Sequence, residues 1–359
     1  MKDILRPFAE VTCARELEAL KSCDDKPKPV GWQLSPWAVA TFVLGGKLPD
    51  GMAIEPKYVG HRRLIEVAIA TLATDRALLL SGLPGTAKTW LSEHLAAAIS
   101  GDSTLLVQGT AGQNEDALRY TWNYARLLAE GPSETALVPS PVMRGMQQGK
   151  LVRIEELSRM PSEVQDALIT ILSEKTLPVP ELNLQIQAVQ GFNVIATSNE
   201  RDKGVNELSN ALRRRFNTVT LPLPVSIEAE VDIVQRRVEQ LGNHMGMAPA
   251  ITPVEEIRRL VAIFRELRNG ITEDGKRPLK SPGSALSTAE AISVIHSGQA
   301  LATYFGDGKV RPADIAAALV GAVVKDQAQD LPAWKEYLET VLKNRETDKE
   351  LYQACKKIL

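Results

Sequence analysis

The sequence predicts an α/β fold in which a parallel five-stranded sheet with helices is followed by a helical domain. Two observations predict the sheet: from Tyr58 onward, apolar runs alternate with helical stretches, and a glycine-rich turn follows the first run. A third observation predicts the helical domain. Beyond Pro224 the strand-like runs stop, and stretches with helical spacing of apolar residues take their place.

Five runs are strand candidates because each is short and rich in aliphatic or β-branched residues. They are RALLLSG at 76–82, STLLVQG at 103–109, GKLVRIEE at 149–156, GFNVIATSN at 191–199 and FNTVTLPLP at 216–224. The helical candidates that follow span 226–242, 253–270, 287–305 and 311–326. We therefore divide the chain into an N-terminal helical extension (1–50), an α/β core (51–224), a helical lid (225–330) and C-terminal helices (331–359).

Composition narrows the class of protein. The formal net charge of the 359 residues is −2, so no overall field attracts nucleic acid or anionic lipid. Cys13, Cys23 and Cys355 lack C-x-x-C spacing, which favours a reducing compartment over a disulfide or zinc framework. The first residues have no apolar signal core, and the longest aliphatic run, Ile315–Val324, is too short to span a bilayer. We expect a soluble cytoplasmic protein with no membrane partner.

The stretch LLLSGLPGTAKTWLSEHL, at 78–95, predicts a phosphate-binding loop between a strand and a helix. Gly82 and Gly85 supply backbone freedom for the tight turn, and a helix is expected to begin near Lys88. The usual pattern has glycine immediately before the lysine, where this chain has Ala87. A methyl group costs little there if φ is negative. The alternative interpretation is a Gly/Pro turn before an ordinary helix.

In such a loop, backbone N–H groups and the helix N-terminus hold phosphate. Lys88 is then expected to reach the outer phosphates, and the hydroxyl of Thr89 to bind Mg²⁺. Downstream, Glu155 and Glu156 end an apolar strand. Nucleotide hydrolysis needs a carboxylate on the metal side and a base that orients the attacking water. Adjacent acids can fill both roles because successive strand side chains point in different directions. The alternative is a solvated acidic loop.

Two further polar features follow the acidic pair. Asn199 lies at the tip of the next strand, where its amide can hold the attacking water; a turn-forming asparagine is the alternative. Arg213, Arg214 and Arg215 end a short helical stretch. We interpret this cluster as a sensor of phosphate charge, against the alternative of a solvated basic surface.

In this order, GLPGTAKT, LVRIEEL, VIATSNE and ALRRRF, with a helical domain behind them, resemble the AAA+ ATPases and, more narrowly, the MoxR family. The resemblance covers roughly 58–326. That family typically carries alanine where Ala87 stands, which favours a nucleotide site. It also carries a hairpin before the first sensor, and the segment 176–190 resembles it, with a turn at 181–183. The resemblance implies an AAA+ core of the P-loop NTPase type followed by a helical lid.

The resemblance also implies ATP and Mg²⁺ as cofactors and a role for individual residues. Thr89 and Glu155 become the metal contacts, Glu156 the catalytic glutamate, Asn199 the first sensor and Arg215 the arginine finger. Arg215 is preferred because the finger of this family immediately precedes the phenylalanine. The implied nucleotide-binding residues are Val59, Gly60, Gly82, Pro84, Gly85, Thr86, Ala87, Lys88 and Thr89.

The sequence departs from the family pattern in three places. Glu155 stands where aspartate is usual, and Arg153 interrupts an apolar strand with no partner evident from the sequence. Where the family often has a second-sensor arginine, the matching stretch KSPGSALSTAEAI has Gly283. Lys280 and Arg277 are the candidates for its role. The two ends of the chain lie outside the motifs, as partner surfaces or as helices packed on the core.

The implied function is ATP hydrolysis by a homo-oligomeric ring, expected to be a hexamer, which remodels or activates a protein partner in a chaperone-like way. Partners with a von Willebrand factor A domain are common in this family. One alternative is a nucleotide-binding scaffold with weak hydrolysis. Another is a nucleic-acid motor, but the hairpin 176–190 has neither lysine nor arginine to meet phosphates. We therefore expect no nucleic-acid partner.

Overall fold

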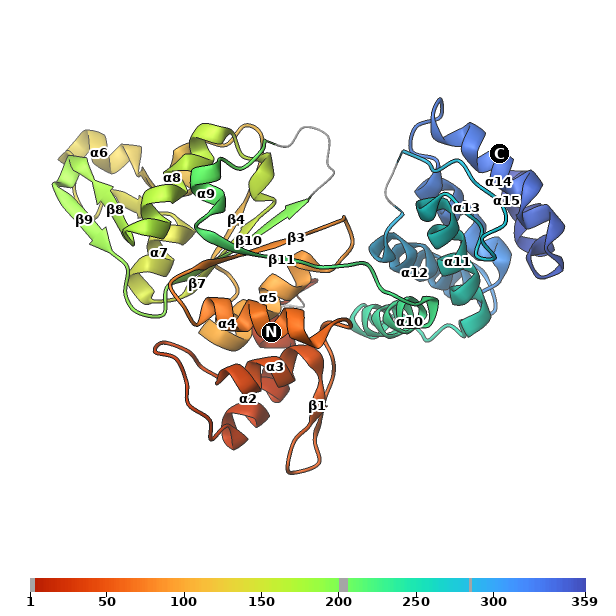
Figure 1. The fold of residues 1–359 in the computed structure, drawn as a ribbon, viewed down its shortest axis with the longest axis horizontal. Coiled ribbons are helices and arrows are strands. Elements are labelled where there is room, and N and C mark those ends of the chain that lie inside the picture. The colour runs from red at the N-terminus through yellow and green to blue at the C-terminus, as the bar shows by residue number, and fades with distance from the viewer. Residues whose placement is uncertain (1–3, 200–205, 284–285) are drawn as a thin grey trace. The chain divides into compact units, whose positions relative to one another are not determined.

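The computed structural model describes residues 4–199, 206–283 and 286–359 (Figure 1). These residues fall into two units. The first comprises the chain up to residue 222 except 84–86, and the second comprises 84–86 with 223–359. The N-terminal helices thus belong to the unit that holds the sheet, and the C-terminal helices belong to the second unit.

The first unit is built on one parallel sheet of five strands, which confirms the predicted fold class. The strand order is β11-β3-β10-β7-β4, and every neighbouring pair is parallel. All five strand candidates contribute one strand each. The bounds are β3 Ala77–Gly82, β4 Leu106–Gln108, β7 Leu151–Glu155, β10 Asn193–Asn199 and β11 Phe216–Thr220.

Strands β3 and β7 are buried along their whole length because helices cover both faces of the sheet. Side chains of β3 alternate between the two faces. Leu78 and Leu80 join an apolar cluster with the N-terminal helices, whereas Ala77 and Leu79 join a second cluster on the opposite face. The core helices are α4 Arg62–Leu72, α5 Lys88–Ser100, α6 Tyr124–Glu130, α7 Pro141–Gln148, α8 Ser162–Ser173 and α9 Asn210–Arg213.

The N-terminal residues form helices that pack on the core. Leu20 and Phe42 are fully buried in the apolar cluster that includes α4 and α5. The hydroxyl of Ser35 caps the third helix by accepting from the N–H of Ala38, and Pro36 occupies the first turn. The elements are α1 Ala9–Thr12, α2 Ala14–Cys23, α3 Pro36–Leu44, β1 Gly46–Lys47 and β2 Ala53–Ile54.

Two antiparallel hairpins extend from the core, formed by β5 Tyr120–Trp122 with β6 Leu137–Pro139 and by β8 Thr176–Val179 with β9 Leu184–Gln187. The second is the hairpin predicted before the first sensor. Its turn runs through the 3₁₀ turn Pro180–Leu182 and ends at Asn183, whose φ of 51° is left-handed. The predicted turn at 181–183 is confirmed.

The second unit is helical, as predicted. Its apolar core includes the fully buried side chains of Phe264, Trp334 and Tyr337. A capping box between Ser287 and Glu290 begins α12. The helices are α10 Ile227–His244, α11 Val254–Asn269, α12 Thr288–Phe305, α13 Pro312–Val323, α14 Asp330–Thr340 and α15 Lys349–Ile358. Across 4–199, 206–283 and 286–359, no helix has the length and apolar composition needed to cross a bilayer.

Candidate functional site

The loop between β3 and α5 contains three residues with left-handed or related backbone angles. Gly82 has φ of 144°, Gly85 has 79° and Ala87 has 64° with ψ of 23°. The helix begins at Lys88, as predicted. The condition under which a methyl group would cost little at Ala87, a negative φ, is therefore not met. An L-residue in this conformation costs about 1–2 kcal/mol, so the loop geometry itself explains why glycine is usual at this position.

The side chain of Lys88 lies along the inside of this loop and is buried. Its ammonium donates to the carbonyl oxygens of Gly82 at 2.9 Å and Leu83 at 2.8 Å. Of the other residues in this loop, Thr86 is buried and Pro84 is half-buried. The arrangement holds a cation next to the N-terminus of α5, where backbone N–H groups favour an anion.

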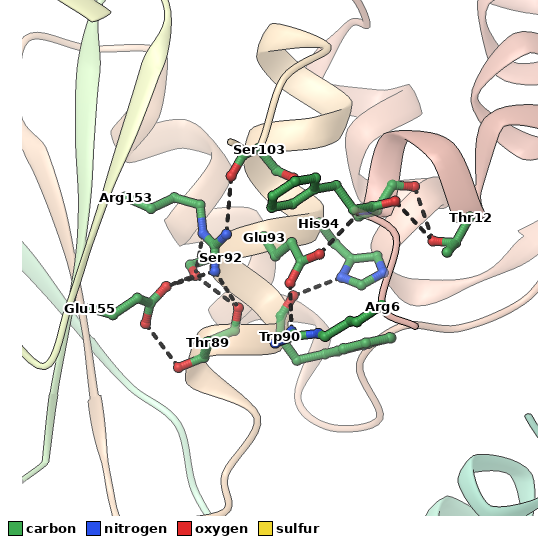
Figure 2. A network of polar contacts seen from close by, with 12 residues as sticks. Arg6, Thr12, Thr89, Trp90, Ser92, Glu93, His94, Ser103, Arg153 and Glu155 are labelled. Carbon is green, nitrogen blue, oxygen red and sulfur yellow. Dashed lines mark hydrogen bonds and ion pairs between the residues drawn. The ribbon is translucent and has the colours of Figure 1, made fainter. Parts of the chain in front are cut away.

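The carboxylate of Glu155, the last residue of β7, is 1% exposed and joins three elements. Its Oε2 accepts from the hydroxyl of Thr89 on α5 at 2.8 Å and from that of Thr197 on β10 at 2.7 Å. Its Oε1 accepts from the hydroxyl of Ser92 and from Arg153 (Figure 2). The structure thus brings Thr89 and Glu155 together. Hydroxyl and carboxylate oxygens are ligands that suit Mg²⁺, so this pair fits the predicted metal.

The contacts of the Arg153 side chain explain why an arginine lies in an otherwise apolar strand. The guanidinium is buried and pairs with Glu155 through Nη2 at 3.0 Å. It also donates to Ser92 Oγ at 3.2 Å and to the carbonyl oxygens of Ser103 at 3.1 Å and Thr89 at 3.3 Å. This partner was missed from the sequence, although residues two apart on a strand share a face and Glu155 could have been found in that way.

Glu156 differs sharply from its neighbour. Its φ of 54° is left-handed, so the chain turns away from β7 here and enters the 3₁₀ turn Leu157–Arg159. The side chain is 34% exposed and pairs with Arg159 at 2.8 Å. Its backbone N–H donates to Thr197 Oγ1 at 3.0 Å. A buried acid and an accessible acid therefore lie side by side.

Asn199 lies at the carboxyl ends of the parallel strands, whereas Arg215 lies at their amino ends. Asn199 is paired in register with Gly82, so it lies beside the start of the loop. Arg215 precedes Phe216, which pairs with Ala77 at the other end of β3. The five residue steps from Ala77 to Gly82 correspond to about 17 Å of strand. The structure therefore does not bring Arg215 to the loop of its own chain.

Arg215 and Arg213 both have partners on residues close to them in the first unit. Arg215 donates to the hydroxyl of Ser173 and the carbonyl of Ala211. Arg213 is exposed and pairs with Glu207 at 3.8 Å. These contacts fix the short segment around α9 at the amino edge of the sheet.

Val59 and Gly60 precede α4 and are separate from the group bonded to Glu155. A Cβ on Gly60 would lie 2.6 Å from the ring of Tyr58, so this glycine is required by close packing. Burial raises the pKa of the Tyr58 hydroxyl. The assignment of Val59 and Gly60 to nucleotide binding stays a prediction.

The candidates for the second sensor are bonded within the second unit. Lys280 pairs with Glu336 at 3.1 Å, and Arg277 donates to the carbonyl of Thr340 at 3.0 Å. The N–H of Gly283 donates to Asp330 at 2.7 Å. Residues 284–285 of this stretch, and Glu200 at the end of the first-sensor motif, lie outside the described residues.

Comparisons with known proteins agree with this geometry. Residues 77–216 match the AAA domain of the dynein-related subfamily, and 228–355 match the YehL-like AAA+ ATPase C-terminal domain. The uncharacterized protein YehL of Escherichia coli K12 is 43% identical over 338 residues, covering 93% of this chain and 91% of YehL. An uncharacterized protein of Staphylococcus aureus USA300 is 29% identical over 150 residues, or 42% of this chain and 56% of that protein.

A solved structure supports the same fold. NtrX from Brucella abortus, in complex with ADP, superposes with a TM-score of 0.51 at 14% identity. The match covers 83% of this chain and 64% of NtrX.

Proposed function

The chain belongs to the AAA+ ATPases with a YehL-like C-terminal domain, and on that basis we propose that it is an ATP-hydrolysing ring ATPase of MoxR type that remodels or activates a protein partner. The observation that carries this proposal is the contact of Thr89 with Glu155. This contact joins the loop helix to the acidic strand end at the carboxyl edge of a parallel sheet, where α/β proteins bind ligands.

In the proposed site, Lys88 holds the outer phosphates of ATP, and Thr89 with Glu155 holds Mg²⁺. The ion, when bound, neutralises charge on the phosphates. Glu156 accepts a hydrogen bond from the attacking water and orients it, because its side chain is accessible while Glu155 is buried. Asn199, beside Gly82, holds the same water from the neighbouring strand.

Arg215 is proposed to serve the site of the next subunit. Its backbone lies at the amino ends of the strands, about 17 Å along β3 from the loop, which is too far for Arg215 to act on the loop of its own chain. An arginine supplied by a neighbour raises the rate of well-studied NTPases by about 10³–10⁵. We propose a homo-oligomeric ring, most simply a hexamer, with one site per interface.

Nucleotide binding and turnover test the proposal directly. Lys88→Ala is expected to abolish most ATP affinity, because the outer phosphates lose their cation. Glu156→Gln is expected to bind Mg²⁺–ATP normally and to stop turnover. Lys349→Ala and Glu163→Gln, which change exposed residues on α15 and α8, are matched controls. Unchanged ATP affinity in a folded Lys88→Ala variant would remove the basis of the site.

A mixing experiment tests the ring. Arg215→Ala and Glu156→Gln subunits are each expected to be inactive alone and to regain partial activity together, because some interfaces then pair an intact arginine with an intact glutamate. Arg213→Ala controls for loss of a neighbouring surface charge. Full activity of Arg215→Ala alone, or of a dilute monomer, contradicts a finger supplied in trans.

A nucleotide-binding scaffold with weak hydrolysis is the second candidate function. The ion pair of Glu156 with Arg159 favours it, because this contact occupies Oε2 of the carboxylate that would orient the water. ATP binding without turnover at every protein concentration would establish the scaffold.

The client and the absence of a nucleic-acid partner are also proposals. A protein with a von Willebrand factor A domain is the client that the family resemblance suggests. The hairpin 176–190 carries no lysine or arginine, so DNA and RNA are expected to leave the ATPase rate unchanged. A several-fold stimulation that disappears at high salt would instead favour a nucleic-acid motor.

A further inference from the structure

The two oxygens of the Glu155 carboxylate have different partners. Oε2 meets two hydroxyl groups, those of Thr89 and Thr197. Oε1 meets the hydroxyl of Ser92 and the guanidinium of Arg153. A hydroxyl can rotate and use its lone pairs instead of its proton, whereas a guanidinium can only donate. Oε2 is therefore the oxygen that can bind a cation once its hydroxyl partners rotate. Oε1 is held in place by the guanidinium of Arg153.

Arg153 holds Oε1 rigidly because its own position is fixed on several sides. Nε is bonded to Ser92, Nη1 to the carbonyl of Ser103, and Nη2 to the carbonyl of Thr89 as well as to Glu155. Ser103 is in turn held by Glu10 of the N-terminal helices, through its N–H at 3.2 Å and its hydroxyl at 2.6 Å. Figure 2 shows the guanidinium between Ser103 on one side and Thr89, Ser92 and Glu155 on the other.

The pair also accounts for glutamate in place of the usual aspartate. Arg153 and Glu155 share one face of β7, and the carboxylate must touch Arg153, Ser92 and the two threonine hydroxyls at once. Aspartate would retract the carboxylate by about 1.5 Å, the length of one C–C bond. A retracted carboxylate would leave the buried guanidinium without its counter-ion, which is costly in a desolvated site.

We propose that Arg153 is a positioning residue that fixes the carboxylate of Glu155 for Mg²⁺. This inference rests on the proposed function, because it concerns the metal of that same site. In this proposal Arg153 acts through Glu155, which it contacts directly, and is not itself a ligand of the metal. Groups that hold a metal ligand in this way typically contribute about 10–100-fold to metal affinity.

The test compares nucleotide affinity with Mg²⁺ and with EDTA, using a fluorescent, non-hydrolysable ATP analogue and the full chain. The ratio of the two affinities reports the metal contribution and is independent of the fraction of protein that is folded. Arg153→Lys keeps the charge but loses the planar fork. It is expected to lower the ratio by about 10–100-fold while leaving the affinity in EDTA nearly unchanged.

Two further variants keep the test decisive if Arg153→Lys folds poorly. Ser92→Ala removes one donor to Oε1 and is expected to lower the ratio several-fold. Glu155→Asp is expected to lower it although aspartate is usual in the family. Arg268→Lys is the matched control, because Arg268 also pairs with a buried glutamate, Glu230, and its ratio should equal that of the wild type.

The outcomes separate the two ideas. No ATP-analogue binding by the wild type would overturn the proposed function itself. Wild-type binding with a large Mg²⁺ ratio, together with an unchanged ratio in Arg153→Lys and Ser92→Ala, would show that Arg153 only stabilises the fold and would overturn this inference alone.

Discussion

The two units each bury a glutamate against arginine, and the two glutamates have different surroundings. Glu155 in the sheet unit meets one arginine and three hydroxyls. Glu230 on α10 is also fully buried, but it meets two arginines, Arg265 at 3.0 Å and Arg268 at 3.1 Å, and one hydroxyl, that of Thr288 at 2.8 Å.

The comparison shows that burial and an ion pair do not by themselves mark a functional acid. Glu230 ties α11 and α12 to α10, and Arg265 and Arg268 extend the network to backbone carbonyls. Every donor to Glu230 has a structural use. At Glu155 the hydroxyl of Thr89 comes from the phosphate-loop helix, so one of its donors belongs to a site where a ligand is expected. The identity of the donors, rather than the exposed fraction, separates the two acids.

The largest expected effect is on the stability of the second unit. Glu230→Gln leaves two partly buried arginines without their buried carboxylate, and loss of one member of a buried pair costs up to about 3–5 kcal/mol in the free energy of unfolding. Chemical denaturation followed by fluorescence, to which the buried Trp334 contributes, measures it. Glu228→Gln, on the exposed surface of the same helix, controls for the charge change. An unchanged midpoint would mean that the arginines find other partners.

Glu155→Gln is expected to disturb function more than Glu230→Gln does. The hydroxyls can rotate to satisfy the amide, but the buried guanidinium of Arg153 loses its counter-ion, so a loss of stability comparable to that of Glu230→Gln is expected as well. Removal of the anionic oxygen should abolish the Mg²⁺-dependent part of nucleotide affinity. Isothermal titration with and without Mg²⁺ measures this, with Glu230→Gln as the reference. The contrast fails if both variants lose the same share of metal-dependent affinity.

A matched pair of threonine changes sharpens the comparison. Thr197→Val and Thr288→Val each remove one hydroxyl donor to a buried glutamate, at about 1–2 kcal/mol per lost contact in the free energy of unfolding. Thr197→Val also removes the acceptor of the Glu156 N–H, so its total cost is expected to be larger. Only Thr197→Val is expected to reduce Mg²⁺–ATP turnover. The denaturation midpoint and the ATPase rate are measured for both variants. A comparable fall in turnover for Thr288→Val would contradict the proposed difference between the two glutamates.

The smallest effect is expected in acid. Burial opposes ionisation of Asp24, but hydrogen bonds from the hydroxyl and N–H of Ser35 outweigh it and lower the pKa. In the second unit, burial likewise opposes ionisation of Asp330, and backbone N–H donors, including that of Gly283, lower its pKa. Both carboxylates stabilise the fold above the unfolded pKa, near 3.9. This contribution disappears as the pH falls through the lower folded pKa.

Asp24→Asn and Asp330→Asn should therefore each flatten the fall in melting temperature between about pH 5 and pH 2. The wild type and both variants are compared across that range. A variant whose melting temperature falls as steeply as that of the wild type would show that its aspartate has an ordinary pKa in the folded protein.

The fold was predictable because its signals are local. Apolar runs and helical spacing located the five strands and the four helices that follow, and Lys88 was correctly placed at the start of α5. The family resemblance assigned Thr89 and Glu155 to one metal ion, and the structure joins the two side chains by a hydrogen bond.

What escaped prediction depends on tertiary context or on backbone angles. Glu10 and Ser103, which support Arg153, lie far from it in sequence, and no local pattern joins them. The sequence left the sign of φ at Ala87 open, because the loop geometry rather than the residue type decides it. The left-handed conformation at Glu156 had no signal, because glutamate rarely adopts it.

The position of Arg215 at one edge of the sheet, with the phosphate loop at the other, gives each chain a direction. If Arg215 acts on a neighbour as proposed, the contact between subunits is heterologous. One surface of each chain supplies the arginine, and a different surface holds the nucleotide site that accepts it. Two chains joined in this way complete one site and leave one arginine and one site unmatched. An open linear assembly of any length likewise leaves one arginine and one site unmatched at its two ends. Only a closed ring gives every chain the same contacts. Activity per chain should then rise with assembly size and level off once rings close.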